Sequence, residues 1–137
     1  MKKILLVLGI IGSSILFMES CTKEDGILND GESRDVFIGS WTATDECSKQ
    51  TYGVDIKADE ENSSRVLVMN FANLGETATA VIAGNSIYIE SQDVGNGYTV
   101  SGNGKLNGAI ISWTKYTYET DAELIECSAT YSNKVKH

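Results

Sequence analysis

The stretch "GNGYTVSGNGKLNG" (residues 95–108) decides the fold, because its glycines fit either a phosphate-binding loop or a β-sheet. A P-loop has a glycine five residues before its Gly-Lys pair and a serine or threonine after it. Around Gly104-Lys105, those two positions hold Thr99 and Leu106, so the stretch is not a P-loop. In a β-sheet, Asn107-Gly108 instead predicts a type I′ hairpin turn, in which both residues have positive φ.

Two more glycines of this stretch, Gly102 and Gly104, lie on one face of a strand predicted over residues 98–106. A glycine inside a strand marks a bend or a close approach of another group. We therefore interpret Gly102 and Gly104 as the place where a small barrel bends.

On both sides of this stretch, short β-like runs alternate with turns rich in Gly, Asn and Asp. The chain contains no proline, so its turns depend on these residues. Short connections between strands are typical of an antiparallel meander. The eight predicted strands cover residues 37–47, 52–58, 65–71, 76–83, 86–91, 98–106, 109–119 and 122–132.

A meander of this kind leaves two exposed edges unless its first strand pairs with its last. Those two strands carry Cys47 and Cys127, and a disulfide between them would fasten the closure. The sequence therefore predicts an all-β fold, a small eight-stranded antiparallel up-and-down barrel. A two-sheet β-sandwich is the alternative.

The first twenty residues differ from the rest of the chain. Lys2 and Lys3 precede an apolar stretch, Ile4–Phe17, that is short for a bilayer crossing. The segment ends in Met18-Glu19-Ser20-Cys21 and resembles a Bacteroidetes-type lipoprotein signal peptide. The resemblance implies removal of residues 1–20 and a membrane anchor through a lipid on Cys21. A cytosolic start with a hydrophobic helix is the alternative.

The residues after Cys21 carry a second resemblance. Thr22-Lys23-Glu24-Asp25 is similar to the acidic signal that places such lipoproteins on the outer face of the outer membrane. It implies a cell-surface location, with a periplasm-facing orientation as the alternative. We predict a flexible acidic tether over residues 21–35, one domain over 36–133 and a C-terminal tail over 134–137. The net charge of −8 disfavours nucleic acid as a partner.

The cysteine count agrees with this location. There are three cysteines, and lipidation of Cys21 leaves Cys47 and Cys127 as a pair in a compartment that permits disulfides. Two free buried thiols are the alternative. Because the only histidine is the last residue, His137, and no CxxC spacing exists, we predict no metal site and no cofactor.

The domain itself resembles a known fold family. Gly39-Ser40-Trp41 opens the first strand, and the spacing "FIGSW…C…NF…G…I…SGNGKLNG…ISW…C.ATY" extends over residues 37–131. Together they resemble the small lipocalin-like (calycin-like) barrels of Bacteroidetes lipoproteins. An eight-stranded barrel either fills its interior with side chains or holds one small ligand there. The predicted inward residues are Trp41, Val54, Ile56, Leu67, Met69, Phe71, Ile87, Ile89, Ile111 and Trp113.

Without an internal histidine, no His-based triad can form, and the Asp45/Glu46 carboxylate pair is expected to face water at a strand end. We therefore predict a protein that is not an enzyme. Its candidate ligand-binding residues are Trp41, Trp113, Tyr116 and Tyr118.

Strand alternation places Tyr116 and Tyr118 on the outer surface if Trp113 points inward. Exposed aromatic rings of this kind stack on sugars or anchor protein partners. The alternatives are a bulge that reverses the alternation, or tyrosines that simply cover a sheet.

These observations predict a lipid-anchored cell-surface protein that binds a small apolar ligand, or a glycan or protein. The alternative is a structural or accessory subunit of an outer-membrane complex, with the barrel as a rigid adaptor.

Overall fold

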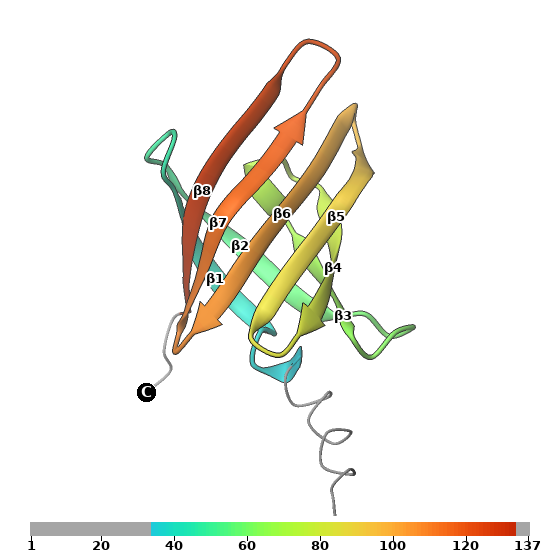
Figure 1. Ribbon diagram of the computed structural model, residues 1–137, viewed down its shortest axis with the longest axis vertical. Coiled ribbons are helices and arrows are strands. Elements are labelled where there is room, and N and C mark those ends of the chain that lie inside the picture. The colour runs from blue at the N-terminus through green and yellow to red at the C-terminus, as the bar shows by residue number, and fades with distance from the viewer. Residues whose placement is uncertain (1–33, 134–137) are drawn as a thin grey trace, which may run out of the picture.

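The computed structural model describes residues 34–133, which form one closed barrel of eight antiparallel strands in sequence order (Figure 1). The expected signal segment, Cys21, most of the tether and the tail lie outside the described residues. The strands are β1 (Gly39–Asp45), β2 (Thr51–Ala58), β3 (Arg65–Met69), β4 (Thr77–Ala83), β5 (Ser86–Gly95), β6 (Tyr98–Asn107), β7 (Ile110–Glu119) and β8 (Leu124–Asn133). A 3₁₀ turn, η1 (Phe71–Asn73), follows β3. Within residues 34–133, no helix has the length and apolarity needed to span a membrane.

The barrel closes where the sequence predicts it. Residues 41–45 of β1 pair with residues 129–133 of β8. A disulfide between Cys47 and Cys127 joins the loop after β1 to β8. The closed barrel is therefore confirmed over the sandwich, and the disulfide over two free thiols.

Inward and outward residues alternate along the strands. In β2, for example, Val54 and Ile56 are buried while Asp55 and Lys57 are exposed. The inward face predicted for β3 is wrong by one residue, because Val66 and Val68 point inward and Leu67 and Met69 do not.

The reason for the error in β3 is that the strand ends at Met69. Asn70 then adopts a left-handed conformation (φ 69°) and turns Phe71 back into the barrel from η1. Phe71 is buried as predicted, but it does not belong to the strand whose alternation was used to place it.

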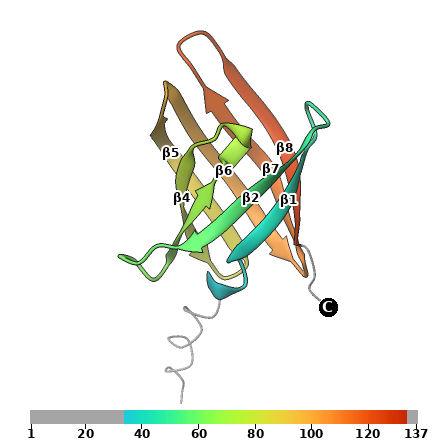
Figure 2. The same cartoon turned by 180° about the vertical axis from the view of Figure 1, so that it is seen from behind.

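Figure 2 shows the barrel from behind. Its interior is filled by aromatic side chains. At one end, Trp41 donates a hydrogen bond from Nε1 to the Phe37 carbonyl (2.9 Å), and Phe37 is fully buried. Towards the other end, Phe71 lies edge-on to Trp113, with ring centroids 5.4 Å apart. Trp113 in turn lies 5.4 Å from the ring of Tyr131.

The glycines of β6 make room for this packing. A Cβ atom on Gly104 would lie 3.1 Å from the Trp113 ring, and one on Gly102 would lie 3.2 Å from it. The ladder between β6 and β7 also shifts register between Asn103 and Gly104. Gly102 and Gly104 therefore admit the indole ring of Trp113 against the backbone of β6 at an irregular point of the sheet.

The type I′ turn was predicted at the wrong hairpin. In the loop between β6 and β7, Gly108 has φ 67°, whereas neither Asn107 nor Ala109 has positive φ. A single positive φ at the first loop residue fits type II′ rather than type I′. The turn with positive φ at both residues is Asn96-Gly97 (φ 56° and 81°), between β5 and β6.

Both described ends of the chain lie at the same end of the barrel, opposite the β7–β8 hairpin (Figure 1). There, Arg34 donates hydrogen bonds from Nη1 to the carbonyls of Asp59 and Asn62, both at 3.2 Å, in the β2–β3 loop. The Asn133 amide donates to the Ala109 carbonyl (3.1 Å) in the β6–β7 loop. We call the opposite end, formed by the loops after β1, β3, β5 and β7, the mouth.

Candidate functional site

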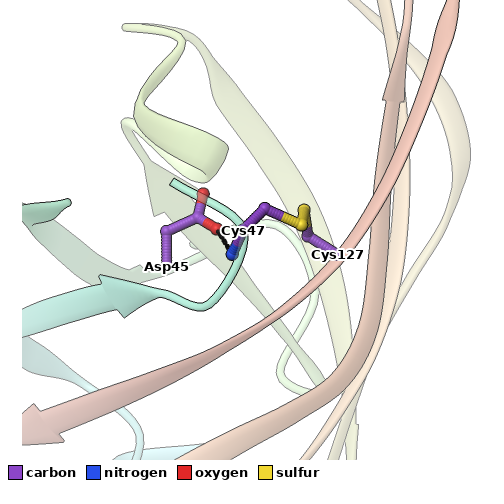
Figure 3. A group of neighbouring side chains, drawn as sticks. All are labelled: Asp45, Cys47 and Cys127. Atoms are coloured by element: carbon purple, nitrogen blue, oxygen red, sulfur yellow. Dashed lines mark hydrogen bonds between the residues drawn. A yellow bond between two sulfur atoms is a disulfide. The ribbon is translucent and has the colours of Figure 1, made fainter. Parts of the chain in front are cut away.

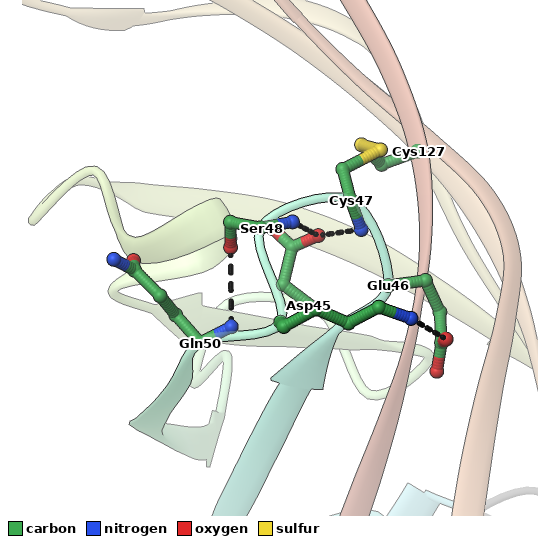
Figure 4. A network of polar contacts seen from close by, with 7 residues as sticks. Asp45, Glu46, Cys47, Ser48, Gln50 and Cys127 are labelled. Atoms are coloured by element: carbon green, nitrogen blue, oxygen red, sulfur yellow. Dashed lines mark hydrogen bonds and ion pairs between the residues drawn. A yellow bond between two sulfur atoms is a disulfide. The ribbon is translucent and has the colours of Figure 1, made fainter.

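The mouth contains a buried carboxylate. Asp45, at the end of β1, is only 9% exposed and is the one buried charged residue within the described part of the chain. Its Oδ2 accepts a hydrogen bond from the Tyr116 hydroxyl (2.6 Å). Its Oδ1 accepts from the backbone N–H groups of Cys47 (2.8 Å) and Ser48 (3.4 Å) (Figure 4). These three donors hold the carboxylate in place, and the expectation that Asp45 faces water is wrong.

The disulfide lies beside this carboxylate (Figure 3). One oxygen of Asp45 and the sulfurs of Cys47 and Cys127 lie within 4.8 Å of one another. Thiolates, however, are the form in which cysteine binds metals, and a disulfide has none. In the oxidised protein, this cluster therefore fixes the mouth end of β1 against β8 and offers no metal-binding set.

Two tyrosine hydroxyls share the environment of Asp45. Burial and the negative charge of Asp45 raise the pKa of Tyr52 to about 12. Burial and the hydrogen bond to Asp45 raise the pKa of Tyr116 well above its ordinary value. The Tyr52 hydroxyl is buried and has no hydrogen-bond partner among the described residues. Both hydroxyls stay protonated at physiological pH and so do not act as bases, and that of Tyr116 donates its hydrogen bond to Asp45.

The two tryptophans of the predicted site belong to the core. Trp41 is 3% exposed and Trp113 is 1% exposed. Neither presents a ring face to solvent, so neither contacts a ligand unless the barrel opens. Their burial agrees with the inward direction predicted for both strands.

The outward direction predicted for Tyr116 is wrong. Trp113 and Tyr116 both point inward, and Tyr116 is only 2% exposed. The reason is a register shift in the β7–β8 ladder between these residues, which changes the alternation over Thr114 and Lys115. This is the bulge that the sequence left open as an alternative.

The same bulge turns Tyr118 towards the inner face of β7, where it is half-buried. Its ring stacks on that of Tyr116, with centroids 6.4 Å apart and planes 17° apart. It also meets the ring of Tyr98 from β6, with centroids 6.3 Å apart and planes at 71°. Ile125 of β8 lies directly opposite Tyr118 in the ladder.

Tyr98, Tyr118 and Ile125 thus lie side by side on three neighbouring strands, all partly exposed, and we call this surface the mouth shelf. Tyr118 was among the binding residues predicted from the sequence, whereas Tyr98 and Asp45 were not. Tyr98 had a usable signal, because it shares the inward face of β6 with Val100.

Several hollows formed by described residues lie on the outer wall. One is lined by Arg65, Thr79 and Gln92, among others, and a second by Thr114, Glu126 and Ser128 beside the disulfide. Neither lining contains an aromatic ring. The mouth shelf is therefore the surface on which partly exposed rings gather.

No protein-family model matches this chain, and no curated protein matches its sequence. The geometry of the mouth is consequently what defines the candidate site.

Proposed function

We propose that this chain is a non-enzymatic, lipid-anchored protein of the outer-membrane surface that binds its ligand on the mouth shelf. The expected lipid on Cys21 precedes the described barrel, and the chain enters the barrel at the end opposite the mouth (Figure 1). An anchor on that side would leave the mouth directed away from the membrane.

The observation that carries the proposal is the contrast between a filled interior and a partly exposed shelf. Trp41, Phe71 and Trp113 occupy the space that an internal apolar ligand would need, whereas Tyr98 and Tyr118 keep part of their rings at the surface. Rigid aromatic rings supply contact area at low entropic cost. Among the ligand positions that the sequence suggests, this arrangement favours the mouth over the interior.

The shelf also rests on a rigid base. The disulfide joins the loop after β1 to β8, and the Asp45–Tyr116 hydrogen bond joins β1 to β7, where the Tyr116 ring stacks on that of Tyr118. A site on rigid strands loses little conformational entropy when a ligand binds.

The proposal is tested by native mass spectrometry of the full-length protein extracted from its own membranes. We expect a bound small molecule on the wild type, its loss from Tyr118→Ala, and its retention in Tyr88→Ala. Tyr88 is a matched control because it is an exposed tyrosine (43%) on the outward face of β5. A ligand that stays bound to Tyr118→Ala, or a wild type that carries none, would overturn the proposed site and favour the role of a rigid accessory subunit.

A further inference from the structure

We propose that the mouth shelf recognises an organic ammonium ion, the charged head group of a small molecule. This inference rests on the proposed function, since it names the ligand class of the same site. It combines three features of the described residues: the geometry of the rings, the charges around them and the buried carboxylate beneath.

The first feature is a corner formed by two rings. Tyr98 and Tyr118 meet at 71° with centroids 6.3 Å apart, so their planes are close to perpendicular. Tyr118 is held in this orientation from behind by the nearly parallel ring of Tyr116. The face of an aromatic ring attracts cations, and aromatic corners and cages are the usual way in which proteins bind alkylammonium groups.

The second feature is the charge of the two hairpins beside the shelf. Residues 93–97 and 119–123 carry Asp93, Glu119, Asp121 and Glu123 and contain no lysine or arginine. The two ion pairs among the described residues, Lys49–Glu46 and Lys115–Glu126, do not involve these acids. The shelf therefore lies in a negative potential, which attracts cations and repels anions.

The third feature is Asp45, whose carboxylate accepts a hydrogen bond from Tyr116, the ring that stacks on Tyr118. Its other hydrogen-bond donors are backbone N–H groups, and it forms no ion pair among the described residues. Burial and the charges of Asp45 and Glu123 raise the pKa of Tyr118. Burial disfavours any ion at this ring, but the negative charges that contribute to the raised pKa also favour a bound cation.

The size of the shelf favours a small molecule over a large partner. Two half-buried rings and one isoleucine side chain match a single head group in size. Ile125, opposite Tyr118, supplies an apolar surface for the methyl or methylene groups that an alkylammonium ion carries and an inorganic cation lacks.

The test is an NMR titration of the full-length protein labelled with [ε-¹³C]tyrosine. The probes are choline and its neutral isostere 3,3-dimethylbutan-1-ol, which share shape and differ in charge. We expect choline to shift the Tyr98 and Tyr118 resonances at low salt and to bind about tenfold more tightly than the isostere. Tyr88, exposed on the outer wall, is the internal control and should not move.

Variants measure separately what the Tyr118 ring and the nearby negative charge contribute to choline binding. Tyr118→Ala should weaken choline binding about tenfold, whereas Tyr118→Phe keeps the ring and should retain it. Glu123→Gln should weaken binding two- to threefold at low salt, roughly the effect of one solvent-exposed charge. Its matched control, Glu60→Gln, changes an exposed acid in the β2–β3 loop at the opposite end and should have no effect.

Equal binding of choline and the isostere at the shelf would overturn the ammonium assignment while leaving the proposed site in place. Shifts confined to residues other than Tyr98 and Tyr118, or no shifts with either probe, would also overturn it. The proposed function fails by a different result, namely a native ligand that is indifferent to Tyr118→Ala.

Discussion

Gly104→Ala is the substitution that tests the packing of the barrel most sharply. The new Cβ atom would lie 3.1 Å from Ile87 Cγ2, 3.1 Å from Trp113 Cδ2 and 3.2 Å from Ile111 Cγ2. These three side chains are at most 1% exposed, so none can retreat towards solvent. Overpacking of this kind costs about 1–3 kcal/mol. Alanine regains about 0.5–1 kcal/mol over glycine in a strand, which leaves a net loss of up to about 2.5 kcal/mol.

The assay is urea unfolding at 25 °C with the disulfide intact, followed by tryptophan fluorescence. Gly53→Ala is the matched control, because Gly53 also lies within a strand without positive φ and a Cβ there meets nothing within 4 Å. We expect Gly53→Ala to be neutral or to gain up to about 1 kcal/mol. If Gly104→Ala proved as stable as Gly53→Ala, the close approach of Trp113 to β6 would be refuted.

The remaining predictions concern the disulfide, the tyrosines and the lipid. Replacing Cys47 and Cys127 together by serine should lower the free energy of unfolding by about 4 kcal/mol, because the bond joins residues 80 apart; a urea curve identical to that of the oxidised wild type would contradict this. Tyr116→Phe leaves a buried carboxylate oxygen without its donor and should cost about 1–3 kcal/mol at neutral pH, so an unchanged melting temperature would count against the hydrogen bond. The pKa of Tyr52 is about 12 when folded and about 10 when unfolded, so the folded state binds more protons above pH 10. Stability should be complete below pH 10 and fall as the pH rises towards 12, and urea unfolding at successive pH values would show no such fall if Tyr52 were solvated. Finally, Cys21→Ala should move the protein from the membrane fraction to the soluble fraction, and a protein that remained membrane-bound would refute lipidation.

The sequence predicted the barrel because its signals are local. Period-2 alternation, short turns and the absence of proline each depend on neighbouring residues. The prediction that the barrel closes needed one long-range signal. Cys47 and Cys127, in the predicted first and last strands, supplied it. The strand lengths were less predictable: β5 continues to Gly95, past the expected end at residue 91.

The site was harder to predict because it depends on register. The bulge in β7 turns both Tyr116 and Tyr118 from the predicted outward direction to the inner face. Its only trace in the sequence is the polar pair Thr114-Lys115 between two aromatic residues. Asp45 is buried because a hydroxyl 71 positions away reaches it. No local pattern around Asp45 could indicate that partner.

The central claim is that recognition takes place on the mouth shelf and not inside the barrel. Its most direct test is a crystal structure of the protein purified from its native membranes with its ligand retained. We expect ligand density against the rings of Tyr98 and Tyr118, with Trp41 and Trp113 packed as they are here. Density inside the barrel between those tryptophans, or a ligand on the outer wall, would contradict it.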